Sequence, residues 1–294
     1  MTFSVNTNIG AAAALQSLNA TSKSLAAVQS RINSGLNVSS TKDDSASYSI
    51  AQNLRGNLSD LKAVTSSLTR AKSVTDVAVA GAEQISDVVN QLKTLAKQSS
   101  DIGISDDTRS AYNKDFTALR DQITTIVNSS EFNGTNLLKT GGGTVSALQS
   151  LTNTASGSGA TYAPDTLSVA NQGLDLPTSE TPCAGSGTGV LGRDSAIDTA
   201  AKAKQAVDTL DTLGKSLASK LSDLGSASRK IDNQITFTSK LSDTIEGGIG
   251  HLVDADLAKE SAKLQALQVK QQLGVQALSI ANQAPQTITS LFRN

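Results

Sequence analysis

Few residues in this 294-residue sequence have the types and spacing needed for catalysis or ligand binding. Residues 187–192 (GTGVLG) match the G-x-G-x-x-G pattern of a dinucleotide-binding turn, and Asp211 follows where such a site places its ribose-binding acid. The residues before this run include Pro182 and do not form the buried strand that the site requires, and the helix predicted after it is too long for a sheet crossover. We interpret residues 187–192 as a linker.

The remaining chemically active side chains also argue against catalysis. Asp43 and Asp44 are adjacent, and neighbours on a helix diverge by about 100° rather than facing one site, so we predict a charge pair in the first turn of a helix. His251 is the only histidine and follows three glycines, where we predict a bend between two helices. With one histidine and one cysteine, the chain lacks His/Cys metal clusters, a histidine-based triad and an intramolecular disulfide. We expect no enzymatic activity, no cofactor and no metal.

Charge and hydropathy narrow the partners. The 25 basic and 26 acidic residues give a net charge of -1, which leaves no overall basic footprint, so we expect no nucleic-acid partner. No apolar run approaches the roughly 18 residues of a membrane helix, so we expect no membrane insertion. The N-terminus lacks the features of a secretory signal. These observations leave a cytoplasmic protein or one exported by a route that does not use a signal peptide.

Long helices dominate the rest of the sequence. From Leu217 to Leu252, apolar residues recur at alternating steps of four and three, which is the heptad pattern of a coiled coil. The same rhythm over 54–96 predicts a second long helix, stopped near Gly103, and over 112–126 a third. Only eight residues are aromatic, so the core must consist mostly of Leu, Ile, Val and Ala.

The two ends of the chain are helical in pattern but nearly uncharged. Residues 15–36 predict a first helix that ends at Gly35. Residues 1–30 contain one charged side chain and residues 261–294 contain three. A helix that faces water normally carries abundant charge on its outer side. We therefore expect both ends to be buried in something larger.

Residues 140–193 differ from both helical regions. Ten of the 22 glycines and three of the four prolines lie between 140 and 192, which predicts an exposed irregular insert with short strands such as 166–169. Its serines and threonines either carry glycans or keep a loop soluble, and composition does not choose between the two. Cys183 lies in this insert, where we predict an exposed thiol that is either native or introduced. Just before the insert, Asn133-Gly134 predicts a tight hairpin.

Several segments resemble conserved motifs of the bacterial flagellins. Residues 29–36 (QSRINSGL) and 41–46 (TKDDSA) are similar to the N-terminal signature, residues 131–138 (EFNGTNLL) to the hairpin motif, and residues 271–283 (QQLGVQALSIANQ) with 291–293 (LFR) to the terminal helix. The wording of the C-terminal motif is most similar to flagellins of alphaproteobacteria. The resemblance covers everything except about 50 residues of the insert.

The resemblance implies a mainly α fold with long paired coiled-coil helices from both chain ends, a small β-hairpin and a Gly/Ser/Thr-rich outer variable insert. It implies inner-tube helices in residues 1–42 and 251–294, an outer-tube helical core in 43–139 and 194–250, and a surface insert in 140–193. It also implies a secreted, non-enzymatic subunit of the extracellular filament used for swimming. Such subunits are exported unfolded by the flagellar type III system, and their terminal helices become ordered on assembly.

The same resemblance implies partners and site residues. The partners are other copies of the chain or other flagellins, the export apparatus and chaperone, and the filament cap and hook-junction proteins. Arg31, Gly35, Asp43 and Asp44 would connect the inner and outer regions. Assembly would depend on apolar residues of the two terminal helices, namely Leu15, Leu18, Leu25, Ile32, Leu264, Leu267, Val275, Leu278, Ile280, Leu291 and Phe292.

Two alternatives are distinct from a filament subunit. A hook–filament junction protein shares the paired terminal helices but serves as an adaptor. An enzyme carried by the insert would need clustered acids, a thiol–histidine pair or metal ligands, and residues 140–193 hold only three scattered acids, Cys183 and no histidine before the final Arg193.

Overall fold

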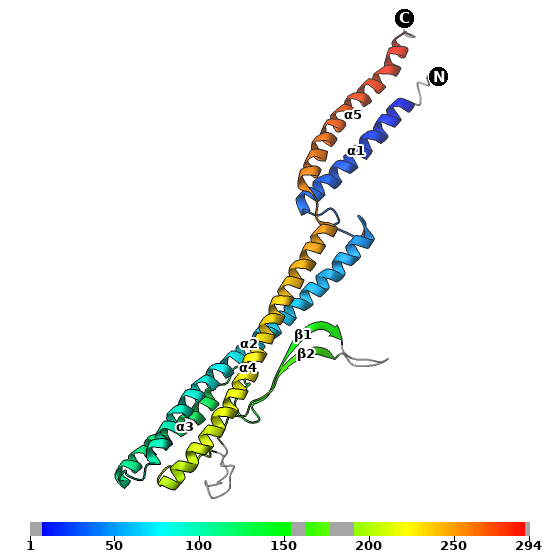
Figure 1. Cartoon of the computed structure of the whole chain (residues 1–294). Coiled ribbons are helices and arrows are strands. Elements are labelled where there is room, and N and C mark those ends of the chain that lie inside the picture. Colours follow the sequence, from blue (N-terminus) through cyan, green and yellow to red (C-terminus); the bar gives the residue numbers. More distant parts are fainter. Residues whose placement is uncertain (1–7, 154–162, 177–190, 292–294) are drawn as a thin grey trace. The chain divides into compact units, whose positions relative to one another are not determined.

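The computed structural model describes residues 8–153, 163–176 and 191–291 (Figure 1). The fold is mainly α-helical, with one small antiparallel sheet. Its elements in chain order are α1 (Ile9–Ser34), α2 (Ser45–Ser99), α3 (Asp106–Ser129), β1 (Val145–Asn153), β2 (Pro164–Val169), α4 (Ala200–Val253) and α5 (Leu257–Leu291). The predicted fold class is confirmed in its helices and its hairpin, while the Gly/Ser/Thr-rich outer insert stays a prediction.

Local sequence signals set the ends of several helices. Gly35 has a φ of 71° and donates its backbone N–H to the Arg31 carbonyl at 2.9 Å, so a left-handed residue ends α1 as predicted. Ser105 begins α3 by accepting a hydrogen bond from the Thr108 N–H, and Asp106 and Asp107 lie in the first turn, where carboxylates favour the helix dipole.

The predicted bend at His251 is wrong in position. Helix α4 continues through Gly247, Gly248 and Gly250 and ends at Val253, and the break before α5 is the short segment 254–256. The backbone groups there pair with the segment after α1, because Asn37 and Val38 donate to the Val253 carbonyl and Ala255 donates to the Gly35 carbonyl. These backbone hydrogen bonds replace the helical ones that are lost at the break.

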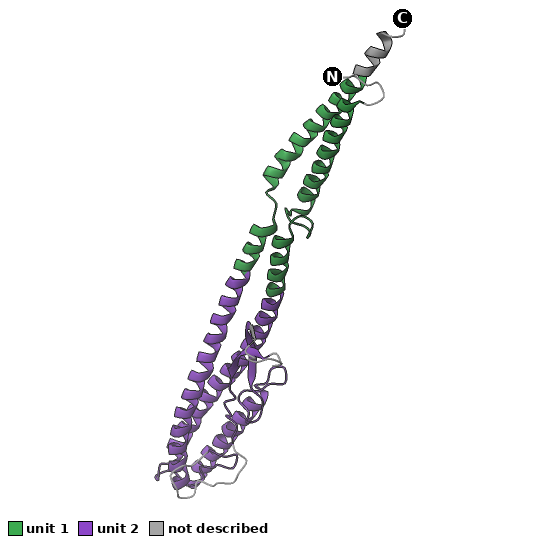
Figure 2. Cartoon of the chain, turned by 90° about the vertical axis from the view of Figure 1, so that its right-hand side faces the viewer, with its two compact units in different colours: residues 1–58, 243–294 green, residues 59–242 purple. Residues whose placement is uncertain are grey.

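Packing divides the chain into two compact units, coloured separately in Figure 2. Unit 1 comprises residues 1–58 and 243–294, and unit 2 comprises residues 59–242. Helices α2 and α4 contribute residues to both units. The three-part division predicted from the sequence stays a prediction.

Unit 2 contains one continuous apolar core. Its largest fully buried side chains come from α2, α3, α4 and the segments between them, and they are Leu68, Leu92, Phe116, Ile123, Leu137, Leu138, Leu191, Ile197, Leu210, Leu217, Leu224 and Ile231. Leu217, Leu224 and Ile231 are members of the predicted heptad seam of α4. The coiled-coil pattern therefore identified the buried face of this helix.

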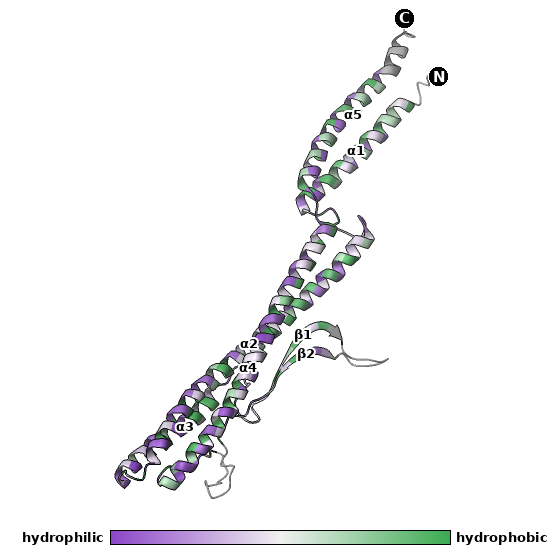
Figure 3. Ribbon diagram, viewed as in Figure 1, coloured by the Kyte–Doolittle hydropathy of each residue, from purple (hydrophilic) through white to green (hydrophobic). Residues whose placement is uncertain are grey.

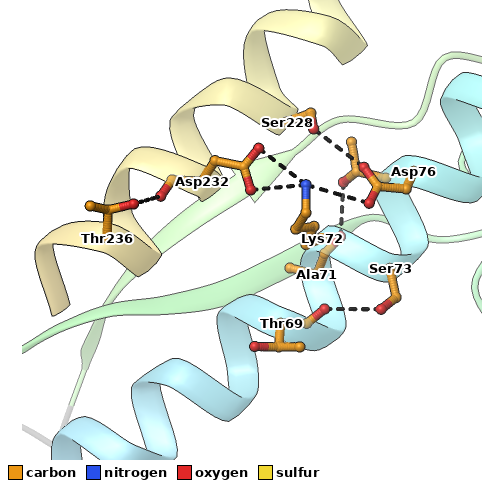
Figure 4. Close-up of polar contacts among 9 residues, drawn as sticks. Thr69, Ala71, Lys72, Ser73, Asp76, Ser228, Asp232 and Thr236 are labelled. Carbon is orange, nitrogen blue, oxygen red and sulfur yellow. Dashed lines mark hydrogen bonds and ion pairs between the residues drawn. The ribbon is translucent and has the colours of Figure 1, made fainter. Parts of the chain in front are cut away.

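Polar pairs mark the register between α2 and α4 within unit 2 (Figure 4). Lys72 Nζ lies 2.8 Å from Asp232 Oδ1, and Ser228 donates to Asp76 Oδ1 at 3.3 Å. Four residues forward on α2 thus correspond to four residues back on α4. Lys93 pairs with Asp211, 21 residues further along each helix in the opposite directions. All three contacts therefore belong to one antiparallel register, and the Asp232 carboxylate raises the pKa of Lys72.

Two hairpins follow α3. The predicted turn at Asn133-Gly134 is confirmed, since both residues have positive φ (51° and 79°) and Phe132 and Thr135 exchange backbone hydrogen bonds. Strands β1 and β2 pair antiparallel with Val145 opposite Val169, and this includes the strand expected at 166–169. Asn136 stabilises the segment between the hairpins by donating to the Val127 carbonyl and accepting from the Leu138 N–H.

Unit 1 has a smaller core. Its buried apolar cluster consists of Val38, Ala51, Ile249 and Val253, with Tyr48 and Ile245 among the partly buried neighbours. This cluster lies where α2 begins and α4 ends, and it does not extend along α1 and α5.

Candidate assembly surfaces

Helices α1 and α5 pack against each other as an antiparallel pair within unit 1 (Figure 1). The Asn8 side chain donates to the Ala281 carbonyl at 2.7 Å at one end of the pair, and Gly274 lies against Leu18 further along. At the other end, Ala255 donates to the Gly35 carbonyl. The two ends of the chain, remote in sequence, thus form one helical pair.

The predicted assembly residues divide into an inner and an outer group. Leu18, Leu25, Ile32, Leu264, Leu267 and Leu278 are half-buried, whereas Leu15 is 48% exposed, Val275 54% and Ile280 69%. The Leu291 side chain and Phe292 lie outside the described residues. The structure therefore brings the inner group together along one pair of helices, and the role of both groups in assembly stays a prediction.

Most of the surface of these two helices is left without packing. Val28 is the one buried residue of α1, and Glu260 is the one buried residue in the part of α5 whose side chains are described, 257–283. Further large apolar side chains, not identified from the sequence, are exposed here: Ile9, Leu257, Val269 and Leu273. Their signal was present in the three- and four-residue spacing of α5, but spacing alone does not show that a second apolar face remains uncovered.

Charge is almost absent from α1. Its 26 residues carry Lys23 and Arg31 and no carboxylate, and most of the helix is white or green in Figure 3, the colours of intermediate and hydrophobic residues. Apolar surface of this extent marks protein–protein contact sites. The geometry is therefore suited to burial against other helices.

Glu260 is a buried charged residue that the sequence did not single out. It is 5% exposed, and Lys263 donates to its Oε1 at 2.5 Å. Its Oε2 has no hydrogen-bond partner within the described parts of the chain. A buried carboxylate oxygen without a partner is unfavourable, which adds to the incomplete packing of this pair.

The predicted connecting residues lie around the segment between α1 and α2. Asp43 accepts hydrogen bonds from the backbone and side chains of Ser39 and Ser40, and Asp44 accepts from Ala46 and Ser47. The prediction of a first-turn pair is wrong in detail, because both residues precede α2, which begins at Ser45. Their short side chains bind backbone N–H groups outside and at the start of the helix.

These hydrogen bonds favour the charged carboxylates. Those from Ser39 and Ser40 lower the pKa of Asp43, and those from Ser47 and Ala46 lower the pKa of Asp44. Gly35 and Arg31 form the end of α1, as described above. The four predicted connecting residues therefore shape the backbone on both sides of one short segment, and nothing in their geometry indicates acid–base catalysis.

Other predicted sites lie outside what can be placed. Cys183 and residues 187–190 of the glycine-rich run are not among the described residues; Leu191 and Gly192, which follow, are buried. In the described parts of the chain, no three His, Cys, Asp or Glu side chains gather as metal ligands. None of the described helices combines the length and hydropathy needed to cross a membrane.

Family comparison decides what kind of protein these helices belong to. The bacterial flagellin N-terminal helical region matches residues 5–141, and the bacterial flagellin C-terminal helical region matches residues 207–292. The chain belongs to the bacterial flagellins. The family resemblance drawn from the sequence motifs is confirmed.

Individual flagellins match over their whole length. Flagellins FljM and FljK of Caulobacter vibrioides are each 42% identical over 290 residues, covering 99% of this chain and 98% of theirs. A flagellin of Brucella melitensis is 36% identical over 291 residues, covering 99% of both chains. Both organisms are alphaproteobacteria, as the C-terminal motif predicted.

Membership of the family establishes the general function. This flagellin is a filament subunit of the bacterial flagellum, and flagellins are structural proteins. Its relatives form the extracellular flagellar filament. The family models cover the helical regions that contain the α1–α5 pair and the α2–α4 core.

Proposed function

We propose that α1 and α5 form the inner layer of a homopolymeric filament and become stably ordered only when neighbouring subunits cover them. The observation that carries this proposal is the near absence of buried residues along the pair. A filament subunit with such helices completes its core through other copies of itself.

Physical chemistry supports this order of events. Fixing the backbone costs about 1–2 kcal/mol per residue, and α1 and α5 contain 26 and 35 residues. Helices in water gain most of their stability from burying an apolar face. Within one subunit this burial is limited to a single seam between α1 and α5, so lateral contacts between subunits must supply the rest.

The same property suits export. A chain whose ends gain their stability from neighbours passes through a narrow channel unfolded and folds where copies accumulate. We propose that the chain leaves the cell unfolded through the flagellar type III apparatus, with its chaperone, and is added below the filament cap. The hook-junction proteins join the filament to the hook. The unbridged single cysteine and the nearly uncharged ends support this proposal.

The paired segments around Gly35 and Val253 are the proposed connection between the inner helices and the outer core. Backbone hydrogen bonds join the two strands of the connection, and Asp43 and Asp44 hold its turn. A short hydrogen-bonded connection transmits small packing changes between layers without unfolding either one. In this proposal, residues 140–193 face outward.

Seeded assembly tests the proposal. Purified subunits are mixed with short filament seeds and followed by electron microscopy and circular dichroism. We expect long filaments and a gain in helical signal. Subunits that cap the seeds without elongation would instead support the junction-protein alternative, and elongation without a gain in helix would contradict coupled ordering.

A truncation sharpens this test. Removing residues 276–294 shortens α5 beyond the point where α1 still has a partner, so we expect filament growth to stop while unit 2 keeps its denaturation transition. The matched control replaces two exposed glutamines of α5, Gln272 and Gln276, by serine, which leaves every apolar contact in place. Normal filaments from the truncated chain would refute the proposal.

A further inference from the structure

An exposed groove in unit 2 combines an aromatic ring with unpaired cations. It lies between α2 and the Asn133-Gly134 turn, and Lys62, Thr69, Arg70 and Phe132 are among its lining residues. The other lining residues are serines, a threonine and an asparagine, so the lining includes two cations and no carboxylate. Neither Lys62 nor Arg70 has a side-chain partner among the described residues.

The aromatic side of the groove is held in place. Phe132 and Thr135 exchange backbone hydrogen bonds of 3.0 and 3.1 Å around the tight turn, and the ring remains 40% exposed. A rigid, half-exposed aromatic beside cations favours a partner that offers an apolar side chain and carboxylates.

Such a ligand exists on the same chain, in the loop between α2 and α3. Ile102 is 78% exposed at its tip, and Asp101, Asp106 and Asp107 are exposed around it. No basic residue lies between positions 98 and 108. The loop therefore presents the apolar and acidic features that complement the groove.

The loop also has a fixed shape. Arg109 is 6% exposed and donates to the carbonyls of Ser99 and Asp101, and Asp101 Oδ1 accepts from the Gly103 N–H at 2.9 Å. Preorganisation of this kind lowers the entropy lost on binding. The exposure of Ile102 is thus built into the loop rather than a result of fraying.

Within one subunit the loop does not reach the groove. Arg70 and Ile102 are 32 positions apart, and most of that separation is continuous α2, which rises about 1.5 Å per residue, so the two sites are about 50 Å apart. A contact between two different surface patches of identical chains is heterologous and generates an open row of subunits.

We propose that the loop around Ile102 of one subunit docks in the Lys62–Arg70–Phe132 groove of the next. Ile102 packs against the Phe132 ring, and the loop carboxylates pair with Lys62 and Arg70. This contact rests on the proposed self-polymerisation and assigns a head-to-tail interface to it, with a repeat of about 50 Å along the row. The terminal helices do not supply this ligand, because α1 has no carboxylate and the described α5 side chains include only the buried Glu260.

Charge reversal tests the contact. One variant carries Lys62→Glu and Arg70→Glu, and a second carries Asp106→Lys and Asp107→Lys. We expect each alone to raise the critical concentration for seeded polymerisation at least tenfold, because like charges meet at every interface. A 1:1 mixture pairs opposite charges at alternating interfaces, so it should polymerise near the wild-type concentration. Reversal of two exposed lysines on α4, Lys204→Glu and Lys230→Glu, is the matched control and should have little effect.

Each outcome has a defined meaning. Wild-type polymerisation by either reversal variant, or failure of the mixture to recover, would overturn the head-to-tail contact. Failure of the wild-type chain to elongate seeds would instead overturn the proposed function itself.

Cysteine cross-linking provides a second measurement that depends less on the folding of charge-reversed chains. In a Cys183→Ser background, filaments grown from a mixture of Ile102→Cys and Phe132→Cys chains are oxidised with copper phenanthroline. We expect covalent dimers between the two kinds of chain. The control mixture pairs Ile102→Cys with Phe237→Cys, an exposed position on α4, and should not cross-link. Equal yields in both mixtures would contradict the contact.

Discussion

Units 1 and 2 use similar helices in different ways. In unit 2, α2, α3 and α4 share a core in which Leu68, Leu92 and Phe116 are fully buried. In unit 1, α1 and α5 pair along one seam, while Leu273 and Ile280 are more than half exposed. Both units have helical sequence patterns, so periodicity alone does not determine whether a subunit folds independently. That depends on whether each apolar face finds a partner within the same chain.

The first way to break this comparison is to remove one leucine from each unit. We expect Leu92→Ala, which creates a cavity in the core of unit 2, to lower the free energy of unfolding of the subunit by about 2–5 kcal/mol. Leu273→Ala, at a 57% exposed position of α5, should change it by less than about 0.5 kcal/mol. Chemical denaturation of the unassembled subunit measures both, and similar losses would show that unit 1 is as fully packed as unit 2.

Two glycines of α2 provide a second test, with opposite signs expected. A Cβ atom on Gly81 in unit 2 would clash with Ser130 and approach Leu138 Cδ1 to 2.9 Å, so Gly81→Ala should lower the free energy of unfolding by about 1–3 kcal/mol. A Cβ atom on Gly56 in unit 1 would meet nothing within 4 Å, so Gly56→Ala should stabilise the helix by about 0.5–1 kcal/mol. Thermal denaturation of the two variants measures the difference, and the same sign for both would contradict it.

The polar pairs between α2 and α4 sharpen the account of unit 2. Lys72 and Lys93 are three heptads apart, so both occupy the same heptad position. A slip of α4 by one heptad would preserve the apolar spacing but place Lys93 opposite Lys204 or Ala218 instead of Asp211. The ion pairs therefore select one register among apolar alternatives.

Reversing one of these charges should have a modest effect. Lys72→Asp places three carboxylates together, with Asp76 and Asp232, and should lower the free energy of unfolding by about 1 kcal/mol, since these side chains are partly exposed. The further change Asp232→Lys should restore part of the loss, and both effects should shrink at high salt. An equal loss in the double variant would argue against a specific pair.

The smallest expected effect is the pH response of the connecting segment in unit 1. The pKa values of Asp43 and Asp44 are lowered in the folded state, so their hydrogen bonds contribute stability above the ordinary carboxyl pKa of 3.8 and lose it as the pH falls below that value. We expect faster amide exchange at Ser39, Ser40, Ala46 and Ser47 at pH 3 than at pH 5, after correction for intrinsic rates. Asp43→Asn with Asp44→Asn should remove this pH response, and its persistence would place the titrating groups elsewhere.

Much of the fold was predictable because its signals are local. The heptad spacing through Leu224 and Ile231 identified the buried face of α4, Gly35 and Ser105 identified helix ends, and Asn133-Gly134 identified a turn. The error at His251 has a local cause as well. Glycine weakens a helix without ending it, and the packing of Ile249 and Val253 keeps α4 helical through this segment.

The candidate surfaces were less predictable because they depend on contacts between distant residues. Spacing identified Leu18 and Leu264 on apolar faces, but whether a face is covered depends on a partner helix more than 200 residues away. The burial of Glu260 and the groove at Arg70 also arise from tertiary packing and have no sequence signature. Recognition of the flagellin motifs supplied the assembly role, which helical periodicity does not specify.

Hydrogen–deuterium exchange of the subunit before and after assembly tests the central claim most directly. We expect amides of α1 and α5 to exchange rapidly in the free subunit and slowly in the filament, while amides around Leu92 and Phe116 exchange slowly in both. Protection of α1 and α5 in the free subunit equal to that of the unit 2 core would show that the terminal pair is stable by itself. That result would contradict the claim that neighbouring subunits complete its packing.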